Sequence, residues 1–278
     1  MYRFLFLIVL FLAACVQPKE GCTDISASNY NAAADVDCCA KIGATCCCTY
    51  PQLRLEIYNF SDTNKYLQQF FRDKNDHIFS LEKSYFYLSD IKLYDQNGQA
   101  FVTTDTVGIF PVGSNSTTSE IKLNNIYRVF PSKNSSFTGL DGRTFRKYGT
   151  FTKISFVLGV MDDLVTNDAS KLDPNKPLGL NTDTLWTAQN GYVHYGIQIK
   201  QDTGVNEQIR LDATGNSARK NVTLPFKYNL NTKESFDVLV KMKIDYNKWF
   251  DGVDIKADKQ TILDKLGVNI VNSFSIIE

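Results

Sequence analysis

The chain has 278 residues, and its 30 lysine and arginine residues balance its 30 aspartate and glutamate residues. This balance excludes the basic excess that is typical of a nucleic-acid-binding protein. The apolar fraction of 43% excludes a disordered stalk and indicates a globular protein with a core. The length suffices for one large β domain or two small ones.

The chain begins with a short leader that is typical of an exported protein. An apolar run from Phe4 to Leu12 is followed by Ala13, Ala14 and Cys15, as in a secretory signal with a small-residue cleavage site. The run is shorter than the roughly 20 residues of a membrane-spanning helix, which argues against that alternative. The end of the leader, L-A-A-C, resembles a bacterial lipoprotein box. We therefore predict a signal peptide over residues 1–14 and lipidation of Cys15, which places the protein on a membrane of the bacterial cell envelope, at the outer membrane on its periplasmic or surface face.

Six cysteines gather in the segment that follows the leader. They are Cys22, Cys38, Cys39, Cys46, Cys47 and Cys48. In an exported protein this density predicts up to three disulfides, and their pairing stays open. Because adjacent cysteines do not easily bond to each other, the bridges are expected to join separate clusters. A thiolate zinc site is the alternative, but zinc sites favour spaced rather than contiguous cysteines. Residues 15–50 are therefore predicted to form a tether and a small disulfide-rich module.

The start of this module, residues 21–37, resembles a short motif of bacterial surface and secreted proteins. Its side-chain oxygens are of the kind that calcium prefers; they belong to Asp24, Asn29, Asn31, Asp35 and Asp37. The same residue types also form turns by accepting hydrogen bonds from nearby backbone. The sequence leaves both readings open, and we favour turns held by disulfides over calcium.

From residue 51 onward the sequence is typical of a β domain. Residues 52–60, Q-L-R-L-E-I-Y-N-F, alternate apolar and polar side chains as a half-buried strand does. Similar runs are found at residues 85–94, 119–123, 152–158, 192–200, 222–228 and 236–244. Turn-like clusters such as residues 95–98 and 141–142 separate them. Many strands and few helices predict an all-β fold, an antiparallel β-sandwich over residues 51–278 with a few short helices.

Three short segments have helical character. They are residues 65–72, 163–172 and 259–266. Asp162 and Asp163 are placed to cap the second of them, and Gly267 is expected to end the third. Gly159 follows a predicted strand, where a glycine tolerates unusual backbone angles in a turn.

Three segments, taken in order, carry a resemblance to a known family. They are HIFSLEKSYFYLSDIKLYDQNGQAF at residues 77–101, KISFVLGVMDDLVTNDASKLDP at residues 153–174 and DTLWTAQNGYVHYGIQI at residues 183–199. Together they resemble the MbnP-like domain, a family of periplasmic proteins associated with the copper chelator methanobactin. The match is strongest at Phe79, Tyr87, Ser89, Ile91, Leu93, Phe156, Leu158, Gly159, Val160, Asn167, Trp186, Gly191 and Tyr192. In layout the resemblance extends over residues 53–278.

The resemblance implies copper binding through histidines and an oxidised tryptophan, a kynurenine made by a partner dihaem peroxidase. Trp186 matches the first tryptophan of the family pattern W-x-W, whereas Ala188 replaces the second. The chain contains only two histidines, His77 and His194, and residues 208–226 lack the further histidine that relatives carry. The metal ligands that the resemblance implies are therefore His194 and His77, together with Trp186.

The fold decides whether these groups meet. Copper(I) favours imidazole, thiolate and thioether ligands, so Met161 or Met242 can add a donor if it lies near the histidines. His194 is expected on a strand, exposed or hydrogen-bonded, and His77 in solvent. The structural alternative for Trp186 is core packing with its polar edge satisfied.

The sequence does not favour an enzyme. It contains no G-x-S-x-G elbow, no H-E-x-x-H and no glycine-rich phosphate loop before a helix. The first functional hypothesis is copper binding or handling by a cell-envelope lipoprotein, in a form that the missing histidine makes degenerate. The second is a non-catalytic surface binding module that has kept the scaffold and lost the metal. An unrecognised hydrolase is the third.

Overall fold

The computed structural model describes most of the chain outside the leader. The described residues are 18–40, 46–61, 70–114, 119–131, 137–180, 185–202, 204 and 207–277. The predicted signal peptide and Cys15 lie outside them. The chain divides into two compact units, Met1–Pro51 and Gln52–Glu278. In the described part of the chain, every helix is too short or too polar to cross a membrane.

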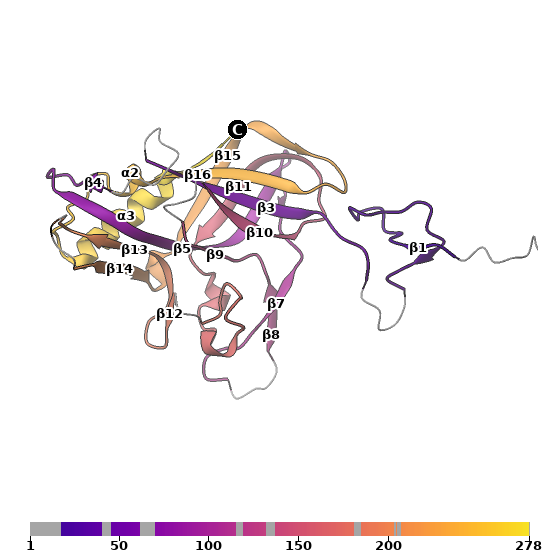
Figure 1. The fold of residues 1–278 in the computed structure, drawn as a ribbon, viewed down its shortest axis with the longest axis horizontal. Coiled ribbons are helices and arrows are strands. Elements are labelled where there is room, and N and C mark those ends of the chain that lie inside the picture. The colour runs from indigo at the N-terminus through magenta and orange to yellow at the C-terminus, as the bar shows by residue number, and fades with distance from the viewer. Residues whose placement is uncertain are drawn as a thin grey trace, which may run out of the picture. The chain divides into compact units, whose positions relative to one another are not determined.

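The larger unit contains a nine-stranded sheet built around one long strand, β5 (Ile78–Asp95). Its main path runs β12 (Trp186–Thr187), β13 (Gly191–Lys200), β5, β11 (Gly149–Leu158) and β15 (Lys220–Thr232). Four further strands pair at its sides: β4 (Phe70–Arg72), β6 (Ala100–Phe101) and β9 (Tyr127–Val129) with β5, and β14 (Ile209–Thr214) with β13. Neighbouring strands are antiparallel throughout these pairs, and Figure 1 shows β13 and β14 beside β5.

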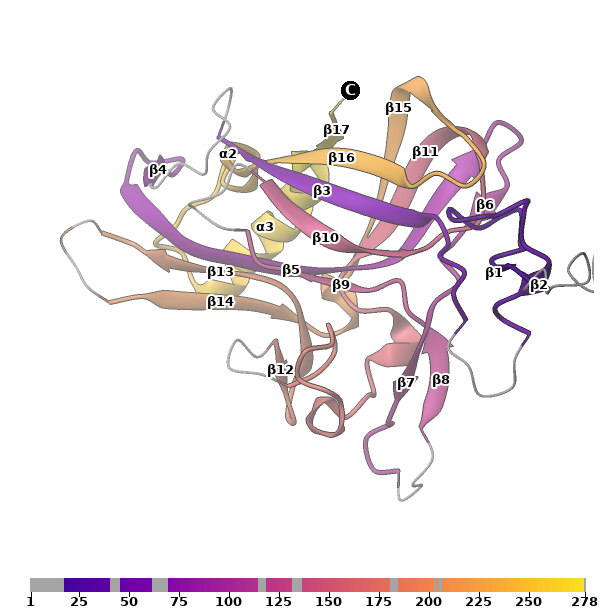
Figure 2. The same ribbon diagram turned by 45° about the vertical axis from the view of Figure 1, so that its right-hand side comes forward.

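A four-stranded sheet forms the second layer. Its order is β10 (Phe137–Thr144), β3 (Gln52–Phe60), β16 (Val238–Asp245) and β17 (Phe274–Ile276). β16 runs parallel to β3, while the other two pairs are antiparallel. A separate hairpin joins β7 (Thr106–Ile109) and β8 (Glu120–Leu123). The two sheets and their connections are seen from two sides in Figures 1 and 2.

The main core lies between the two sheets and is closed by helices. Leu53, Leu55 and Ile57 of β3 are buried in the same cluster as Leu88 and Leu93 of β5. These helices are α2 (Tyr246–Trp249) and α3 (Lys259–Ser273), with the short 3₁₀ turn η3 (Asn216–Ala218) beside them. The 3₁₀ turns η1 (Asp162–Leu164) and η2 (Ala169–Lys171) contribute buried residues to a second, smaller cluster. α3 packs against strands of both sheets (Figure 2). The predicted all-β sandwich with a few short helices is therefore confirmed.

The strand predictions hold where side chains alternate, and one predicted turn is wrong. β3 covers the predicted residues 52–60 from end to end. Asp141 and Gly142 lie inside β10 rather than in a turn. They are the two residues at which the pairing of β10 with β3 shifts its register, between Leu140 and Arg143. Gly142 is needed there, since a side chain on it would collide with Gln52 of β3.

The helix predictions need more correction. Phe70–Arg72 forms strand β4 and not the end of a helix; residues 62–69 lie outside the described part. Residues 163–172 form two separate 3₁₀ turns, and the first begins after Met161 without a side-chain cap. Gly267 does not end α3, which continues to Ser273. A Cβ on Gly267 would lie 2.5 Å from the hydroxyl of Tyr195, so this glycine permits the helix to approach β13.

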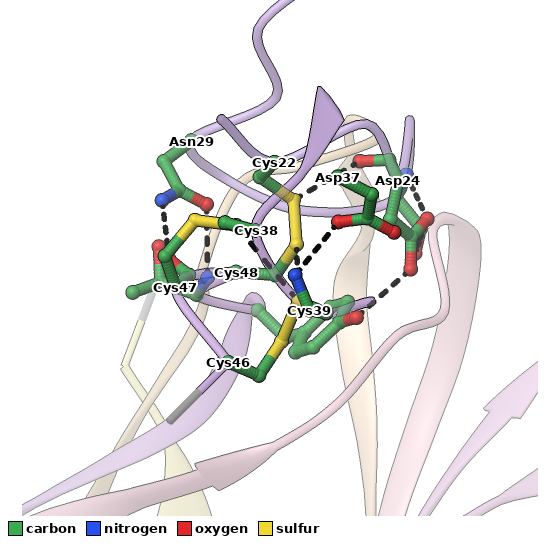
Figure 3. Close-up of a disulfide and its surroundings, with 12 residues drawn as sticks. Cys22, Asp24, Asn29, Asp37, Cys38, Cys39, Cys46, Cys47 and Cys48 are labelled. Atoms are coloured by element: carbon green, nitrogen blue, oxygen red, sulfur yellow. Dashed lines mark hydrogen bonds between the residues drawn. A yellow bond between two sulfur atoms is a disulfide. The ribbon is translucent and has the colours of Figure 1, made fainter. Parts of the chain in front are cut away.

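The N-terminal module is held by three disulfides between the cysteine clusters, as predicted. They join Cys22 to Cys48, Cys38 to Cys47 and Cys39 to Cys46 (Figure 3). The side chains of Asp37, Cys38, Cys39 and Cys48 lie close enough together to be considered as a metal site. All three of these cysteines form disulfides, so none of them is a thiolate ligand for zinc. Regular structure in the module is limited to the parallel pair β1 (Glu20–Gly21) and β2 (Val36–Asp37) among the residues described.

The aspartate and asparagine side chains of the module make turn hydrogen bonds. Asp24 accepts from the backbone and hydroxyl of Ser26 and from the hydroxyl of Tyr50. Asn29 accepts from Thr49 and donates to the Cys47 carbonyl (Figure 3). The remaining three each accept from a backbone N–H, and they are Asn31, Asp35 and Asp37. This pattern favours the turn interpretation over calcium, because the oxygens already point at protein donors.

Candidate metal centre

His194 is buried at a bulge in β13. The register of β13 against β14 shifts between Val193 and Tyr195, and the His194 side chain is inaccessible to solvent. Its Nδ1 accepts a hydrogen bond of 3.1 Å from the backbone N–H of Val160. Because Nδ1 is the acceptor, the neutral ring carries its proton on Nε2. Nε2 is buried, and the backbone of Gly215 acts as an acceptor for its proton, so neither nitrogen offers a free lone pair to a metal.

The backbone after β11 is shaped around this imidazole. Gly159 has φ +123°, and a Cβ on it would lie 2.9 Å from Nδ1 of His194 and 2.9 Å from Cγ of Arg219. The Gly159 carbonyl accepts a hydrogen bond of 2.6 Å from the hydroxyl of Ser89, while Arg219 forms an ion pair with Asp162. The expected turn at Gly159 is thus present. It places the backbone of Gly159 and Val160 against the imidazole of His194, next to Arg219.

The surroundings keep His194 uncharged. Burial lowers the pKa of His194 to about 4, and the positive charge of Arg219 adds to this effect. The backbone of Gly215 and the charge of Asp162 act in the opposite direction without reversing it. A neutral, enclosed imidazole is consistent with a hydrogen-bonded structural residue.

We expect His194 to make the fold sensitive to mild acid. The pKa falls from about 6.5 in the unfolded chain to about 4 in the folded protein, so this contribution to stability is present above pH 6.5 and is lost as the pH falls toward 4. The difference corresponds to roughly 3 kcal/mol. His194→Asn keeps an acceptor near the Nδ1 position and removes the titration. Urea unfolding from pH 7.5 to pH 4 should show a flatter profile for the variant, with parallel profiles above pH 7; a variant as acid-sensitive as the wild type would contradict this assignment.

His77 lies in a different environment, at the start of β5. Its side chain is 38% exposed, and Nδ1 lies 2.9 Å from Oδ2 of the buried Asp73. Asp73 also accepts from the backbone N–H groups of Asn75, His77 and Ile255. Burial raises the pKa of Asp73, but these hydrogen bonds outweigh it and hold the pKa at about 2. The predicted solvated histidine is therefore half exposed and paired with a carboxylate that ties the β4–β5 turn to the loop before α3.

A second acidic group lies near this pair. Asp254 places a carboxylate oxygen within 4.8 Å of the ligand atoms of Asp73 and His77. It accepts from Asn75 and lies 3.8 Å from the amino group of Lys74. Both oxygens of Asp73 already accept hydrogen bonds from the β4–β5 turn and from Ile255. The cluster therefore serves to hold these two loops together.

The two histidines cannot share one metal ion. Tyr195 is in register with Phe86 of β5, so His194 lies near residue 87, whereas His77 immediately precedes β5. The two positions are about ten residues apart along the strand, which corresponds to roughly 30 Å. Neither methionine brings the two histidines together: Met242 is buried in the main core, and Met161 packs against a second cluster that includes Val160 and Val193 on the His194 side.

Trp186 belongs to that second core cluster, on the far side of β5 from the main core residues. It lies opposite Tyr192 in the β12–β13 hairpin and is partly buried. Tyr192 packs edge-on against Tyr87, donates to the Leu178 carbonyl at 2.9 Å and accepts from Asn167 at 2.8 Å. The aromatic residues thus have the packing role that the sequence offered as the alternative to a metal site.

The residues that carry the family pattern therefore mostly build the scaffold. Asn167 links the N–H of Phe110 to the hydroxyl of Tyr192, and Tyr87 donates to the carbonyl of Pro177. No sequence motif marks Arg219 or Asp73, the charged residues beside the two histidines, because each comes from a segment without a recognisable pattern. Their roles depend on contacts between distant segments.

Comparison with known proteins identifies the family of the chain. The sequence model of the MbnP family matches residues 50–266. The chain belongs to the MbnP family. Among solved structures, it is similar to MbnP from Methylosinus trichosporium, with 11% identity, a TM-score of 0.42, and 74% of this chain and 80% of that chain covered. A search of curated proteins finds no match.

The donors of this MbnP family member do not fit the copper centre that the resemblance implies. Copper(I) requires several soft or imidazole donors around one ion. His194 has one nitrogen occupied by Val160 and the other protonated, and His77 lies roughly 30 Å away by strand register. His77 retains Nε2 as its open nitrogen when Nδ1 donates to Asp73, so it offers a single ligand.

Proposed function

We propose that this chain is a non-catalytic binding protein of the bacterial cell envelope, built on the MbnP scaffold and lacking a strong copper site. The observation that supports this proposal is the state of His194. Its Nδ1 accepts from Val160, and Gly159 and Arg219 pack against the ring. A metal at Nε2 would require a proton on Nδ1, which would then face another donor.

Copper handling is the alternative, and family membership favours it. For His194 to act as a ligand, the Val160 N–H would have to leave Nδ1, and Trp186 or Met161 would have to move from the second core cluster. Close-packed interiors resist such rearrangements. If copper is bound in the native state, a dihaem peroxidase would be the expected partner for modification of Trp186.

Attachment to the membrane is a separate part of the proposal. Cys15 follows a short apolar run and two alanines, which supports a lipid anchor and a cell-envelope location. The tether and the cysteine module would then stand between the lipid and the β domain in the sequence. Three disulfides are in keeping with an exported, oxidising location.

Titration of copper(I) against a competing chelator tests the proposal. We expect the purified protein to lose copper(I) to an equal concentration of bathocuproine disulfonate, because strand register places the two histidines roughly 30 Å apart. His194→Ala should leave this weak binding unchanged. His77→Ala serves as the matched variant, since it removes the imidazole whose Nε2 is open.

Tight one-to-one binding that His194→Ala abolishes would overturn the proposal and restore copper handling as the function. Tight binding that His77→Ala alone abolishes would also overturn it and would place the metal beside Asp73. Circular dichroism of each variant shows whether the fold has survived, so that loss of binding is not confused with loss of structure.

A further inference from the structure

A basic cleft lies between β9 and β10, where the two sheets approach each other. Its volume is about 410 Å³, and β9 and β10 lie side by side in both views (Figures 1 and 2). Arg128, Arg143 and Lys176 line it together with a single carboxylate, that of Asp141. The cleft therefore carries an excess of two positive charges. It shares no residue with the surroundings of His77 or His194.

The two arginines are held in place by the protein while keeping donors available. Arg128 donates from Nη1 to the Gly179 carbonyl at 3.1 Å, and its guanidinium lies 5.7 Å from the ring centre of Phe130. Arg143 donates from Nη1 to the carbonyls of Asp141 and Gly142, and its guanidinium lies 4.9 Å from the ring centre of Tyr127. Carbonyl and ring contacts of this kind fix the guanidinium plane without neutralising its charge.

Two polar atoms beside the cleft lack partners. The Tyr127 hydroxyl and Nε of Arg143 are buried and have no hydrogen-bond partner in the described part of the chain. Tyr127 is 3% exposed. Burial raises the pKa of Tyr127 to about 12, so the hydroxyl keeps its proton and remains a donor. Leaving buried donors unpaired is costly, and a side-chain shift that turns them toward an acceptor in the cleft would remove this cost.

We propose that this cleft binds a small organic anion through a carboxylate group. The planar forks of Arg128 and Arg143 match a carboxylate in shape and charge, and Lys176 adds a third positive charge at the exposed edge. The volume of about 410 Å³ lies in the range of metabolite pockets and is larger than an inorganic ion would fill. This inference rests on the proposed binding role and names the chemical class of the ligand.

Isothermal titration calorimetry of the full chain in detergent tests the proposal, with succinate as the probe. Inorganic phosphate and sodium chloride at matched ionic strength are the comparison titrants. We expect saturable one-to-one binding of succinate, weaker binding of phosphate and no saturable binding of chloride. Tyr127→Phe and Arg128→Gln should each weaken succinate binding by about tenfold or more, because each removes a donor to a charged acceptor.

Two features keep this experiment decisive. Tyr127→Phe removes only an unpaired hydroxyl, so it should fold at least as well as the wild type even if Arg128→Gln does not. Lys233→Gln removes an exposed lysine outside the cleft and should leave the affinity unchanged. Absence of saturable succinate binding, equal affinity in all variants, or tighter binding of phosphate would overturn the proposal. The titrations contain a copper chelator, so their failure is distinguishable from any result of the copper experiment.

Discussion

Reduction of the three disulfides is expected to unfold residues 18–50 and to leave the melting transition of residues 52–278 unchanged. The buried apolar side chains of the module are Cys22 and Ala27 among the residues described, which is too small a core to replace its cross-links. Each disulfide of a small exported domain typically contributes about 2–4 kcal/mol. Hydrogen exchange measured by mass spectrometry, with and without dithiothreitol, should therefore show loss of protection in the module alone.

The sizes of the disulfide loops provide a graded control. Cys22–Cys48 closes a separation of 26 residues, whereas Cys39–Cys46 closes 7. Paired serine replacement at the first bond should therefore expose the module to trypsin more than paired replacement at the second. Equal protection in the reduced and oxidised protein, or a fall in the main melting temperature on reduction, would contradict the prediction.

The strands could be predicted where one face must enter the core. In β3 the residues Leu53, Leu55 and Ile57 alternate with polar neighbours and are at most 1% exposed. β10 lacks this signal, because Gly139, Asp141 and Gly142 interrupt it and a register shift divides it. β10 forms because it pairs with β3, so its own sequence does not show the alternation that predicts a strand.

Helix ends were predicted less well, for a related reason. Gly267 has the sequence context of a helix stop, yet α3 continues through it to Ser273. The glycine is there because the hydroxyl of Tyr195 occupies the space that a side chain would need. Asp162 has the context of a helix cap, yet it pairs with Arg219 from a distant segment. In both cases a tertiary contact overrides a local preference.

The candidate metal residues were identified from the sequence, but their relation to each other was not. His194 lies on β13 and His77 immediately precedes β5, so only the register of β13 on β5 shows that roughly 30 Å separates them. The state of His194 depends in turn on Val160 and Gly159, which the family pattern already marked. In this chain Gly159 and Val160 of the L-G-V pattern pack against the imidazole of His194. The pattern does not by itself identify a copper ligand.

Replacement of Gly159 by alanine is expected to be among the most destabilising single changes in the β domain. At φ +123° an alanine is strained, and its Cβ would lie 2.9 Å from Nδ1 of His194 and 3.0 Å from Cβ of the same residue. Backbone strain and overpacking each typically cost about 1–3 kcal/mol, so we expect a loss of roughly 4 kcal/mol. For a domain of this size that corresponds to a fall in melting temperature on the order of 10 °C.

The matched control for this change is Gly149→Ala. Gly149 has a similar φ of +132°, but a Cβ there has nothing within 4 Å, so only the backbone strain remains. The difference between the two alanine variants therefore measures the close contacts of the new Cβ with His194 and Arg219, and the contact with His194 is tested separately. If that contact is the cause, Gly159→Ala combined with His194→Ala should recover part of the lost stability, because the double change removes the ring atoms that the new Cβ meets. Equal destabilisation by Gly149→Ala and Gly159→Ala would show that strain alone accounts for the effect and that the imidazole is not packed against this backbone.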